Sequence, residues 1–533
     1  MSDLQQTYEN TPYPSFSYTQ THPDRLATIA AILGLTPPPI EQCRVLEIGC
    51  ASGGNLIPMA TTLPRSEFVG IDFSARQIEA GQEVITGLGL TNVRLLVQDI
   101  LQITADFGPF DYIIAHGIYS WVPPEVREKL LQLCQQNLSP QGLAYISYNT
   151  YPGWHMMGAL REMMLFHTRH LAEGPEKVTA ARELLHFLGE AVPSSDETFL
   201  GAYGTLIKAY GKFVDEQRQE AKAGDELLLH DELELFNQPV YFHEFMAQAG
   251  QYGLQYVAEA DFAMVMPNGF EPGVVQQLMK LAKSTVELEQ YMDFLRNRTL
   301  RQTLLCHEAV TVNRRLQPSP ELMRQFYVAS WARPMAQEVD VAGKTAVSFQ
   351  ASDGAMFTTD HPLTKAALLL LGRLQPTAVA FDELVVGAQA FLGQAIGEQD
   401  VQVLAVNLLR GFSYSFKLVE LHKMVLPFVE GVSERPLASP LSRYQVQNNL
   451  RVVNQRHERV NLDKISLYLL PFLDGTRTPD DLLALLLNLV AEGTIQVKVD
   501  EAAGVDTAVI QHQMAQELQS LLNWLSKAAL LVG

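Results

Sequence analysis

The sequence predicts an α/β fold in its first part, built on a mostly parallel sheet with helices on both faces. Between residues 43 and 150, short apolar segments alternate with segments of helical period. A glycine-rich turn follows the first apolar segment and opens a helix. Strands of a parallel sheet are buried on both faces and therefore read as continuous apolar runs, which is the pattern seen here.

The alternation assigns each element in chain order. A first helix is predicted at residues 24–34, and it ends at Gly34, where a proline-rich spacer begins. Strands are predicted at 43–50, 67–74, 93–100, 110–117 and 142–149. Helices are predicted between them at 55–64, 75–89 and 124–138.

After residue 150 the pattern becomes helical, with no strand periodicity up to about residue 225. Residues 239–265 read as a helix, a glycine turn and a strand, which we expect to return to the first sheet as its last strands. Residues 271–330 read as mostly helical. A hairpin with two helices at 338–385, and a further unit from residue 460, favour winged-helix modules.

The predicted organisation therefore has five parts. They are a ligand-binding domain at 1–150 plus 226–268, a helical insertion at 151–225, a helical middle region at 269–330, a winged-helix-like domain at 331–435 and a second one at 436–533. The helical insertion would lie beside the open edge of the site.

Composition limits the class of protein. The chain of 533 residues has a net charge of −20 and a pI near 5.1, and an acidic chain repels phosphate backbones. We therefore expect no nucleic-acid partner and interpret the basic run at 442–464 as interdomain surface. No signal peptide is apparent, and no run reaches the ~18–20 apolar residues that span a bilayer. The four cysteines lack metal or Cys-x-x-Cys spacing, so we expect reduced thiols in a soluble, cytoplasmic protein.

The turn after the first strand carries the spacing Glu47-x-Gly49-x-Ala51-x-Gly53. A dinucleotide site would require Gly-x-Gly-x-x-Gly, whose second glycine lets the backbone approach a pyrophosphate. The carboxylate of Glu47 would repel a pyrophosphate and attract the ammonium group of an amino acid. The spacing (Asp/Glu)-x-Gly-x-(Gly/Ala)-x-Gly is typical of S-adenosylmethionine binding, and we place the nearby Asn55 at the same site.

Two further acids end the next two strands. Asp72 can accept from both hydroxyls of a ribose, and Asp99 can accept from an adenine amino group, with Phe73 and Ile100 flanking the ring. Each acid alone is equally well explained as a solvated strand end or a cap. Three strand-end acids in register with a glycine loop favour a cofactor site.

Residues 45–150 resemble the class I S-adenosylmethionine-dependent methyltransferases. This resemblance implies a Rossmann-like domain with a seven-stranded mixed sheet, whose antiparallel last strand we expect at 252–265. Because this fold methylates many classes of substrate, the resemblance alone does not name the acceptor.

Other stretches resemble bacterial methyltransferases that carry a methyltransferase regulatory domain, including the rickettsial protein-lysine methyltransferases that modify outer-membrane protein lysines. The matching stretches are "YENTPYPSFSYTQTHPDRLATIAAILG", "HGIYSWVP", "SYNTYPGW", "PVYFHEFM" and "LLPFLDGTRTPDDLLALL". The resemblance spans nearly the full chain. It implies a long helical middle domain, winged-helix-like C-terminal domains and a protein-lysine substrate.

In class I folds the acceptor lies beyond the ends of the fourth and fifth strands. We therefore expect His116 to back the cofactor, and Tyr119, Tyr148 and Asn149 to orient the acceptor amine. Trp121 and Trp154 are equally well explained as packing the insertion onto the sheet.

The N-terminal arm is rich in tyrosine and is expected to close over the cofactor. The arm contains Tyr8, Tyr13, Tyr18 and His22; Tyr13 and Tyr18 are the candidate lid residues, with Tyr13 assigned to the cofactor, and a loosely packed arm is the alternative. No metal site is expected, because the histidines and acids around His243 match no ligand spacing.

The sequence thus predicts an S-adenosylmethionine-dependent methyltransferase acting on lysine of a protein substrate, with a homodimer permitted by amphipathic surface at 271–330. Two alternatives stay open. One is a methyltransferase of small molecules or natural products, and the other is a non-enzymatic regulator that senses S-adenosylmethionine.

Overall fold

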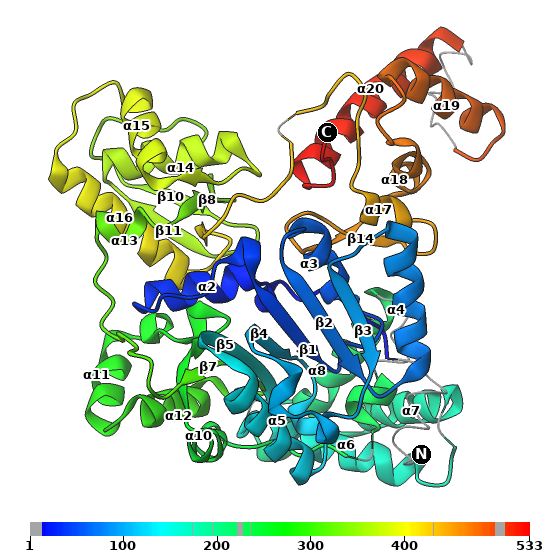
Figure 1. The fold of residues 1–533 in the computed structure, drawn as a ribbon, viewed down its shortest axis with the longest axis vertical. Coiled ribbons are helices and arrows are strands. Elements are labelled where there is room, and N and C mark those ends of the chain that lie inside the picture. Colours follow the sequence, from blue (N-terminus) through cyan, green and yellow to red (C-terminus); the bar gives the residue numbers. More distant parts are fainter. Residues whose placement is uncertain are drawn as a thin grey trace.

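The structure is a computed structural model that describes residues 13–533 except 173, 196, 221–227, 235, 430 and 496–506. A body built around the large sheet forms the lower part of Figure 1. Two smaller bodies lie above it, one carrying α14–α16 on the left and one carrying α17–α20 on the right. Helix α2 (Pro23–Ile32) lies between the lower body and the left-hand one.

The large sheet has seven strands in the order β3-β2-β1-β4-β5-β7-β6. The strands are β1 (Arg44–Ile48), β2 (Glu67–Asp72), β3 (Val93–Val97), β4 (Phe110–Ala115), β5 (Leu138–Asn149), β6 (Leu254–Glu259) and β7 (Leu300–His307). The first five pair in parallel, while β7 runs antiparallel to both β5 and β6. The predicted seven-stranded mixed sheet is therefore confirmed.

The identity of the antiparallel strand differs from the prediction. The segment expected at 252–265 forms β6 at the edge, and the strand between β5 and β6 is β7, which the sequence analysis placed in a helical region. Only α11 (Pro272–Leu281) and α12 (Thr285–Arg296) of that region are long helices.

Strand β7 was missed because a charged residue interrupts its apolar pattern. Arg301 is fully buried, and its guanidinium donates to Glu259 at 2.8 Å, Asp293 at 2.8 Å and Glu289 at 3.1 Å. Burial of an arginine requires such partners, since an unpaired buried charge is costly. These carboxylates come from β6 and α12 and are not apparent as partners in the sequence.

Helices cover both faces of the sheet, as a parallel sheet requires. On one face, α2, α3 (Leu56–Thr62) and α4 (Ala75–Leu88) pack against side chains such as Val45, Phe68 and Tyr112. On the other, α5 (Pro124–Asn137) and α10 (Phe242–Gln251) pack against alternate side chains of the same strands.

The segment after β5 is helical, as expected, and comprises α6 (Gly153–Thr168), α7 (Pro175–Ala191) and α8 (Phe199–Glu220). These helices form a small core of their own. Exposed hydrophobic side chains also occur on α11 and α12, and whether this surface mediates a homodimer stays a prediction.

The left-hand body contains the expected hairpin, β10 (Val347–Gln350) with β11 (Met356–Thr359), and adds β9 (Arg333–Pro334) to it. The two expected helices, α14 (Pro362–Leu374) and α15 (Phe381–Leu392), are separated at Pro376, and α16 (Glu398–Tyr414) follows. A second small sheet joins β8 (Tyr327–Ala329), β12 (Val379–Ala380) and β13 (Glu420–His422).

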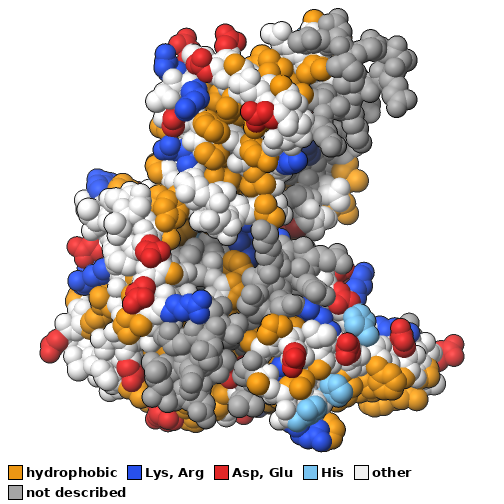
Figure 2. All heavy atoms as spheres, turned by 90° about the vertical axis from the view of Figure 1, so that its right-hand side faces the viewer, with side chains coloured by type: hydrophobic (Ala, Val, Ile, Leu, Met, Phe, Trp, Pro, Cys, Tyr) orange, Lys and Arg blue, Asp and Glu red, His pale blue; other side chains and the backbone are white. Residues whose placement is uncertain are grey.

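The C-terminal body contains α17 (Pro440–Gln445), α18 (Lys464–Leu469), α19 (Pro479–Ala491) and α20 (Thr507–Lys527). A hairpin of β14 (Arg451–Val453) and β15 (Arg459–Asn461) extends from it. Figure 2 shows hydrophobic side chains gathered among charged ones on the upper part of its view, which is this body.

Two classes of feature are absent from the described residues. None of their helices is long and apolar enough to cross a membrane. No group of histidine, cysteine and acidic side chains among them could hold a metal ion. The four cysteines are unpaired and buried.

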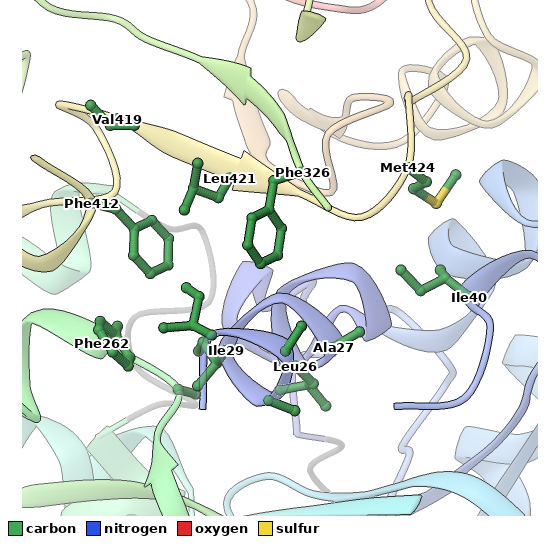
Figure 3. Packing of buried hydrophobic residues seen from close by; sticks show 14 of the residues in the cluster. Leu26, Ala27, Ile29, Ile40, Phe262, Phe326, Phe412, Val419, Leu421 and Met424 are labelled. Carbon is green, nitrogen blue, oxygen red and sulfur yellow. The ribbon is translucent and has the colours of Figure 1, made fainter. Parts of the chain in front are cut away.

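Helix α2 is apolar around most of its circumference. Leu26 and Ile29 are fully buried, and Figure 3 shows Ile29 between Phe262 and Phe412, with Phe326 and Leu421 on the other side of the helix from the large sheet. The helix therefore acts as shared core between the sheet and the left-hand body.

One carboxylate on α2 is buried together with this apolar surface. Asp24 accepts from the backbone N–H of Lys423 at 2.7 Å and from Nδ1 of His422 at 2.7 Å. His422 Nε2 lies 3.3 Å from a carboxylate oxygen of Glu420. The two carboxylates raise the pKa of His422 to about 9, so the imidazolium is retained at neutral pH.

The same ion network reaches the C-terminal body. Arg456, in the turn between β14 and β15, donates to Glu420 and lies 3.3 Å from Glu458. Lys417 donates to Glu458 at 2.7 Å. Three parts of the chain that are distant in sequence are thus joined by buried, alternating charges.

Stability is therefore expected to fall with rising pH in a defined window. Because the pKa of His422 rises from its ordinary 6.5 to about 9 on folding, its contribution is complete below pH 6.5 and is lost as pH rises through 9. A shift of this size corresponds to at most about 3 kcal/mol. Urea unfolding at pH 6.5 and 9.5 should show the loss in the natural protein and a much smaller one in His422→Gln.

The control is His186→Gln, since His186 pairs with Asp215 at the surface, where 58% of its side chain is exposed. This variant should keep the pH dependence of the natural protein. An unchanged pH dependence in His422→Gln would contradict the assignment.

Candidate functional site

A cavity of about 660 Å³ opens at the carboxyl ends of β1 to β4. Its size lies within the ~300–1,000 Å³ range of small-molecule sites. The loops after these strands and the N-terminal segment 13–18 form its walls. Every residue predicted to contact a cofactor lines it except Gly53; these are Tyr13, Glu47, Gly49, Ala51, Asn55, Asp72, Phe73, Asp99, Ile100 and His116.

The loop after β1 takes left-handed backbone conformations at alternate positions. The φ angle is +69° at Gly49, +47° at Ala51 and +75° at Gly53. A Cβ on Gly49 would lie 2.1 Å from Cδ1 of Ile118, so an alanine there would require the Ile118 side chain to move. Gly53 instead faces Leu95 and the sheet, which explains why it does not line the cavity.

Asp72 holds this loop in place. One carboxylate oxygen accepts from the backbone N–H of Ala51 at 2.9 Å, and the other accepts from that of Ser74 at 2.9 Å. Because Ala51 has positive φ, the hydrogen bond supports a conformation that alanine rarely adopts. The second strand end therefore organises the turn after the first.

Glu47 is the buried acid of the site. Its Oε1 accepts from Asn55 Nδ2 at 2.7 Å, while its Oε2 is buried and has no hydrogen-bond partner among the described residues. Burial raises the pKa of Glu47 to about 8, despite the opposing hydrogen bond from Asn55. An unpaired carboxylate oxygen at the cavity wall is suited to a cationic donor from a ligand.

Asp99 is exposed and caps the short helix Ile100–Gln102, accepting from the backbone N–H of Leu101 at 2.9 Å. Asp99 is therefore a helix cap, which was one of the two explanations given above, and it also lines the cavity. The three strand-end acids have different environments: one buried, one held by backbone N–H groups and one exposed.

The N-terminal segment closes one side of the cavity through main-chain contacts. Gly54 N–H donates to Ser15 Oγ at 2.7 Å, and Gln77 Nε2 donates to the carbonyl of Tyr13 at 2.8 Å. Tyr18 N–H donates to Asn55 Oδ1 at 2.9 Å. Ser15 and Gln77 were not predicted, because contacts to backbone atoms leave no signal in side-chain patterns. Tyr8 lies outside the described residues.

His116 lines the cavity, as expected. Its ring centroid is 3.8 Å from that of Tyr18, and its Nδ1 lies 2.9 Å from the hydroxyl of Tyr145. Burial lowers the pKa of His116 to about 4, so the ring is neutral at physiological pH. A base of such low pKa is a poor proton acceptor.

Two tyrosines assigned to the acceptor do not line the cavity. Tyr119 is fully buried, with its hydroxyl donating to Gln248 on α10. Tyr148 is 2% exposed, stacks on Phe245 at 4.2 Å, and places its hydroxyl 3.1 Å from that of Thr303. The structure corrects both assignments, since a strand-end tyrosine can bury its ring in the core and still satisfy its hydroxyl.

Asn149 also lies outside the cavity lining. Its Nδ2 donates to Asn237 Oδ1 at 3.1 Å, and its backbone N–H donates to Ser120 Oγ at 2.8 Å. The residue connects the end of β5 to two neighbouring loops. Its assignment to the acceptor is corrected in the same way.

Aromatic side chains instead gather at the rim of the cavity. Trp121 lines the cavity and meets Trp154 edge to face at 6.5 Å. Close by in sequence, Tyr151 stacks on His155 at 4.0 Å and lies 5.2 Å from Tyr241, which precedes α10. Trp154 is buried, whereas Trp121, Tyr151 and Tyr241 are half-buried and His155 is exposed.

Comparisons with known proteins are consistent along the whole chain. Three family profiles match: a methyltransferase domain at residues 45–142, a predicted methyltransferase regulatory domain at 224–307, and the C-terminal winged helix domain of PKMT at 434–530. The second match spans β6 and β7, so its residues complete the large sheet. The third confirms the predicted C-terminal winged helix.

Relatives that match nearly the whole chain or about half of it are also found. The protein RP789 of Rickettsia prowazekii is 31% identical over 525 residues, covering 96% of this chain and 91% of its own length. RP028 of the same organism is 39% identical over 247 residues, 46% of this chain and 93% of its own. The structure of PKMT2 from Rickettsia typhi in complex with AdoHcy superposes with a TM-score of 0.85 at 29% identity, covering 98% of this chain and all of that one.

The cavity floor can be tested by a matched pair of substitutions. Gly49→Ala and Gly89→Ala both place alanine at positive φ, +69° and +65°, but an added Cβ at Gly89 meets nothing within 4 Å. Both should lose about 1–2 kcal/mol of unfolding free energy to the backbone conformation. Gly49→Ala should lose more, because its Cβ conflicts with Ile118, and urea unfolding measures the difference. Equal losses of unfolding free energy in the two variants would show that the Ile118 side chain moves aside at no cost.

Proposed function

Since this chain belongs to the family of S-adenosylmethionine-dependent methyltransferases that carry a methyltransferase regulatory domain and a PKMT winged helix, we propose that its acceptor is a lysine side chain of a protein. The cofactor supplies an electrophilic methyl group on a sulfonium centre. The residues of the chain must bind the cofactor and the acceptor, orient them for methyl transfer and exclude water.

The cavity residues fit this cofactor. The unpaired, buried Oε2 of Glu47 suits the ammonium of the methionine moiety. Asp72 suits the ribose hydroxyls, because a carboxylate can accept about four hydrogen bonds and can therefore hold the loop at the same time. Phe73, Asp99 and Ile100 are assigned to the adenine.

The acceptor amine must be neutral to attack a methyl group, and free lysine has a pKa of about 10.4. His116 is assigned to the cofactor wall and not to proton removal, because burial lowers its pKa to about 4. We therefore assign the selection of neutral lysine to desolvation by aromatic surface at the rim, where rings also favour a cationic sulfonium.

The observation that carries the protein-substrate proposal is this rim. Trp121 lines the cavity and is only half-buried; its ring packs on buried Trp154, which is followed in the chain by the exposed His155. An acceptor attached to a large molecule needs such an open approach, whereas a small acceptor is served by an enclosed pocket. The name of PKMT2 from Rickettsia typhi supports the same assignment.

Methyl transfer can be traced directly. The protein is incubated with S-adenosylmethionine carrying a labelled methyl group and with a lysate of its source cells. We expect label in acid-precipitable protein, recovered as methyl-lysine after hydrolysis, and at least a tenfold loss of label with Asp72→Ala. The control is Asp106→Ala, which alters an exposed acid outside the cavity lining.

Label confined to small molecules would replace the protein substrate by a small-molecule one. Absence of label from both fractions, together with measurable cofactor binding, would favour a sensor of S-adenosylmethionine.

Cofactor affinity should depend on pH through Glu47. The pKa of Glu47 is about 8 in the free protein, and the ammonium of the ligand requires its ionised form. Affinity should therefore rise up to about tenfold per pH unit toward pH 8 and level off above it, where Glu47 is already ionised.

Calorimetry with S-adenosylhomocysteine between pH 6 and 9 measures this profile. Glu47→Gln retains an oxygen that accepts from Asn55 but cannot ionise. It should bind more weakly at pH 8 and lose the rise below pH 8. A rise of equal slope in both proteins would exclude Glu47 as its source.

A further inference from the structure

The turn between β14 and β15 brings a residue of the C-terminal body to the wall of the cofactor cavity. His457 is 3% exposed, and its Nε2 lies 2.8 Å from Oδ1 of Asn55. Its carbonyl also accepts from Thr19 Oγ1 at 3.3 Å. In Figure 1 the β14 hairpin lies beside α3, the helix that follows Asn55.

Asn55 stands at the centre of a directed set of hydrogen bonds. Its Nδ2 donates to Glu47 Oε1 at 2.7 Å and to Thr21 Oγ1 at 2.9 Å. Its Oδ1 accepts from the backbone N–H of Tyr18 at 2.9 Å. Because the carboxylate of Glu47 and the N–H of Tyr18 fix which end of the amide faces which partner, His457 must donate from Nε2.

The protonation of His457 agrees with this role. Burial lowers its pKa well below the ordinary value, so the ring is neutral and carries one proton. With that proton on Nε2, the other nitrogen, Nδ1, can only accept, and it has no partner among the described residues. The imidazole of His457 therefore makes its hydrogen bond through Nε2, to Asn55, a residue that lines the cavity.

The turn that presents His457 is held firmly. The φ angle of His457 is +61°, a conformation that residues other than glycine adopt uncommonly. Such conformations persist only where the surroundings impose them. Here the neighbouring Arg456 and Glu458 are tied to Glu420 and Lys417.

We infer that the C-terminal body is part of the cofactor site, and that His457 is a positioning residue that orients Asn55. Through Asn55 it sets the carboxylate of Glu47 and the closing segment at Tyr18, both of which line the cavity. This inference rests on the proposed cofactor. It makes cofactor affinity depend on a domain of which no described residue lines the cavity itself.

A matched pair of variants tests the hydrogen bond. His457→Gln restores an N–H donor of similar reach, and His457→Met provides an unbranched side chain of similar size without a donor. Both carry the same cost of positive φ, and urea unfolding checks that each variant is folded under the conditions of the binding measurement. Binding of S-adenosylhomocysteine by calorimetry should weaken about tenfold in His457→Met and by less than about threefold in His457→Gln.

The results separate this inference from the proposed function. If the natural protein fails to bind S-adenosylhomocysteine, the proposed function fails. If the natural protein binds and His457→Met binds equally well, or if the two variants lose affinity equally, His457 does not act through its donor and the inference is overturned.

A measurement on the natural protein covers the case in which the variants do not fold. S-adenosylhomocysteine should slow hydrogen exchange of backbone amides at 454–458 in the C-terminal body, because bound ligand stabilises Glu47, Asn55 and the turn together. Exchange at 454–458 that is unchanged by ligand would overturn the inference.

Discussion

A single buried carboxylate on α2 constrains the arrangement of the whole molecule. Asp24 is buried in a helix whose other side chains form a shared core, so it needs cationic and N–H partners from the bodies that cover it. His422 provides the charge, and Glu420 and Arg456 extend the alternation to the C-terminal body. Apolar contacts are non-directional and permit several relative positions of these bodies. Buried ion pairs require defined donor and acceptor geometry, so they favour one arrangement.

A carboxyl group serves three purposes in the cavity, because each of the three positions supplies a different environment. Glu47 is desolvated and therefore near the point of ionisation at physiological pH. Asp72 is engaged by backbone N–H groups and organises the loop. Asp99 remains exposed at a helix start. Chemical identity alone does not distinguish these roles, and burial and hydrogen bonding do.

The sequence allowed the sheet, the glycine loop and nearly all of the cavity lining to be predicted, because apolar period and loop spacing are local properties. It did not allow β7 to be recognised, since the partners of Arg301 lie on α12 and β6. Nor did it show that Tyr119 and Tyr148 turn into the core, or that His457 reaches Asn55. Each of these depends on contacts between residues far apart in the chain, which no local pattern records.

The contact between His457 and Asn55 also has a consequence for the order of events during synthesis. The two residues are separated by 402 positions. At ~5–20 residues per second, roughly 20–80 s pass between the emergence of one and the other from the ribosome. The sheet and its glycine loop can fold on the ribosome within that interval, but Asn55 still lacks the hydrogen bond from His457. A nascent chain, or a fragment ending before residue 457, thus has the shape of the catalytic domain while its cofactor site is still incomplete.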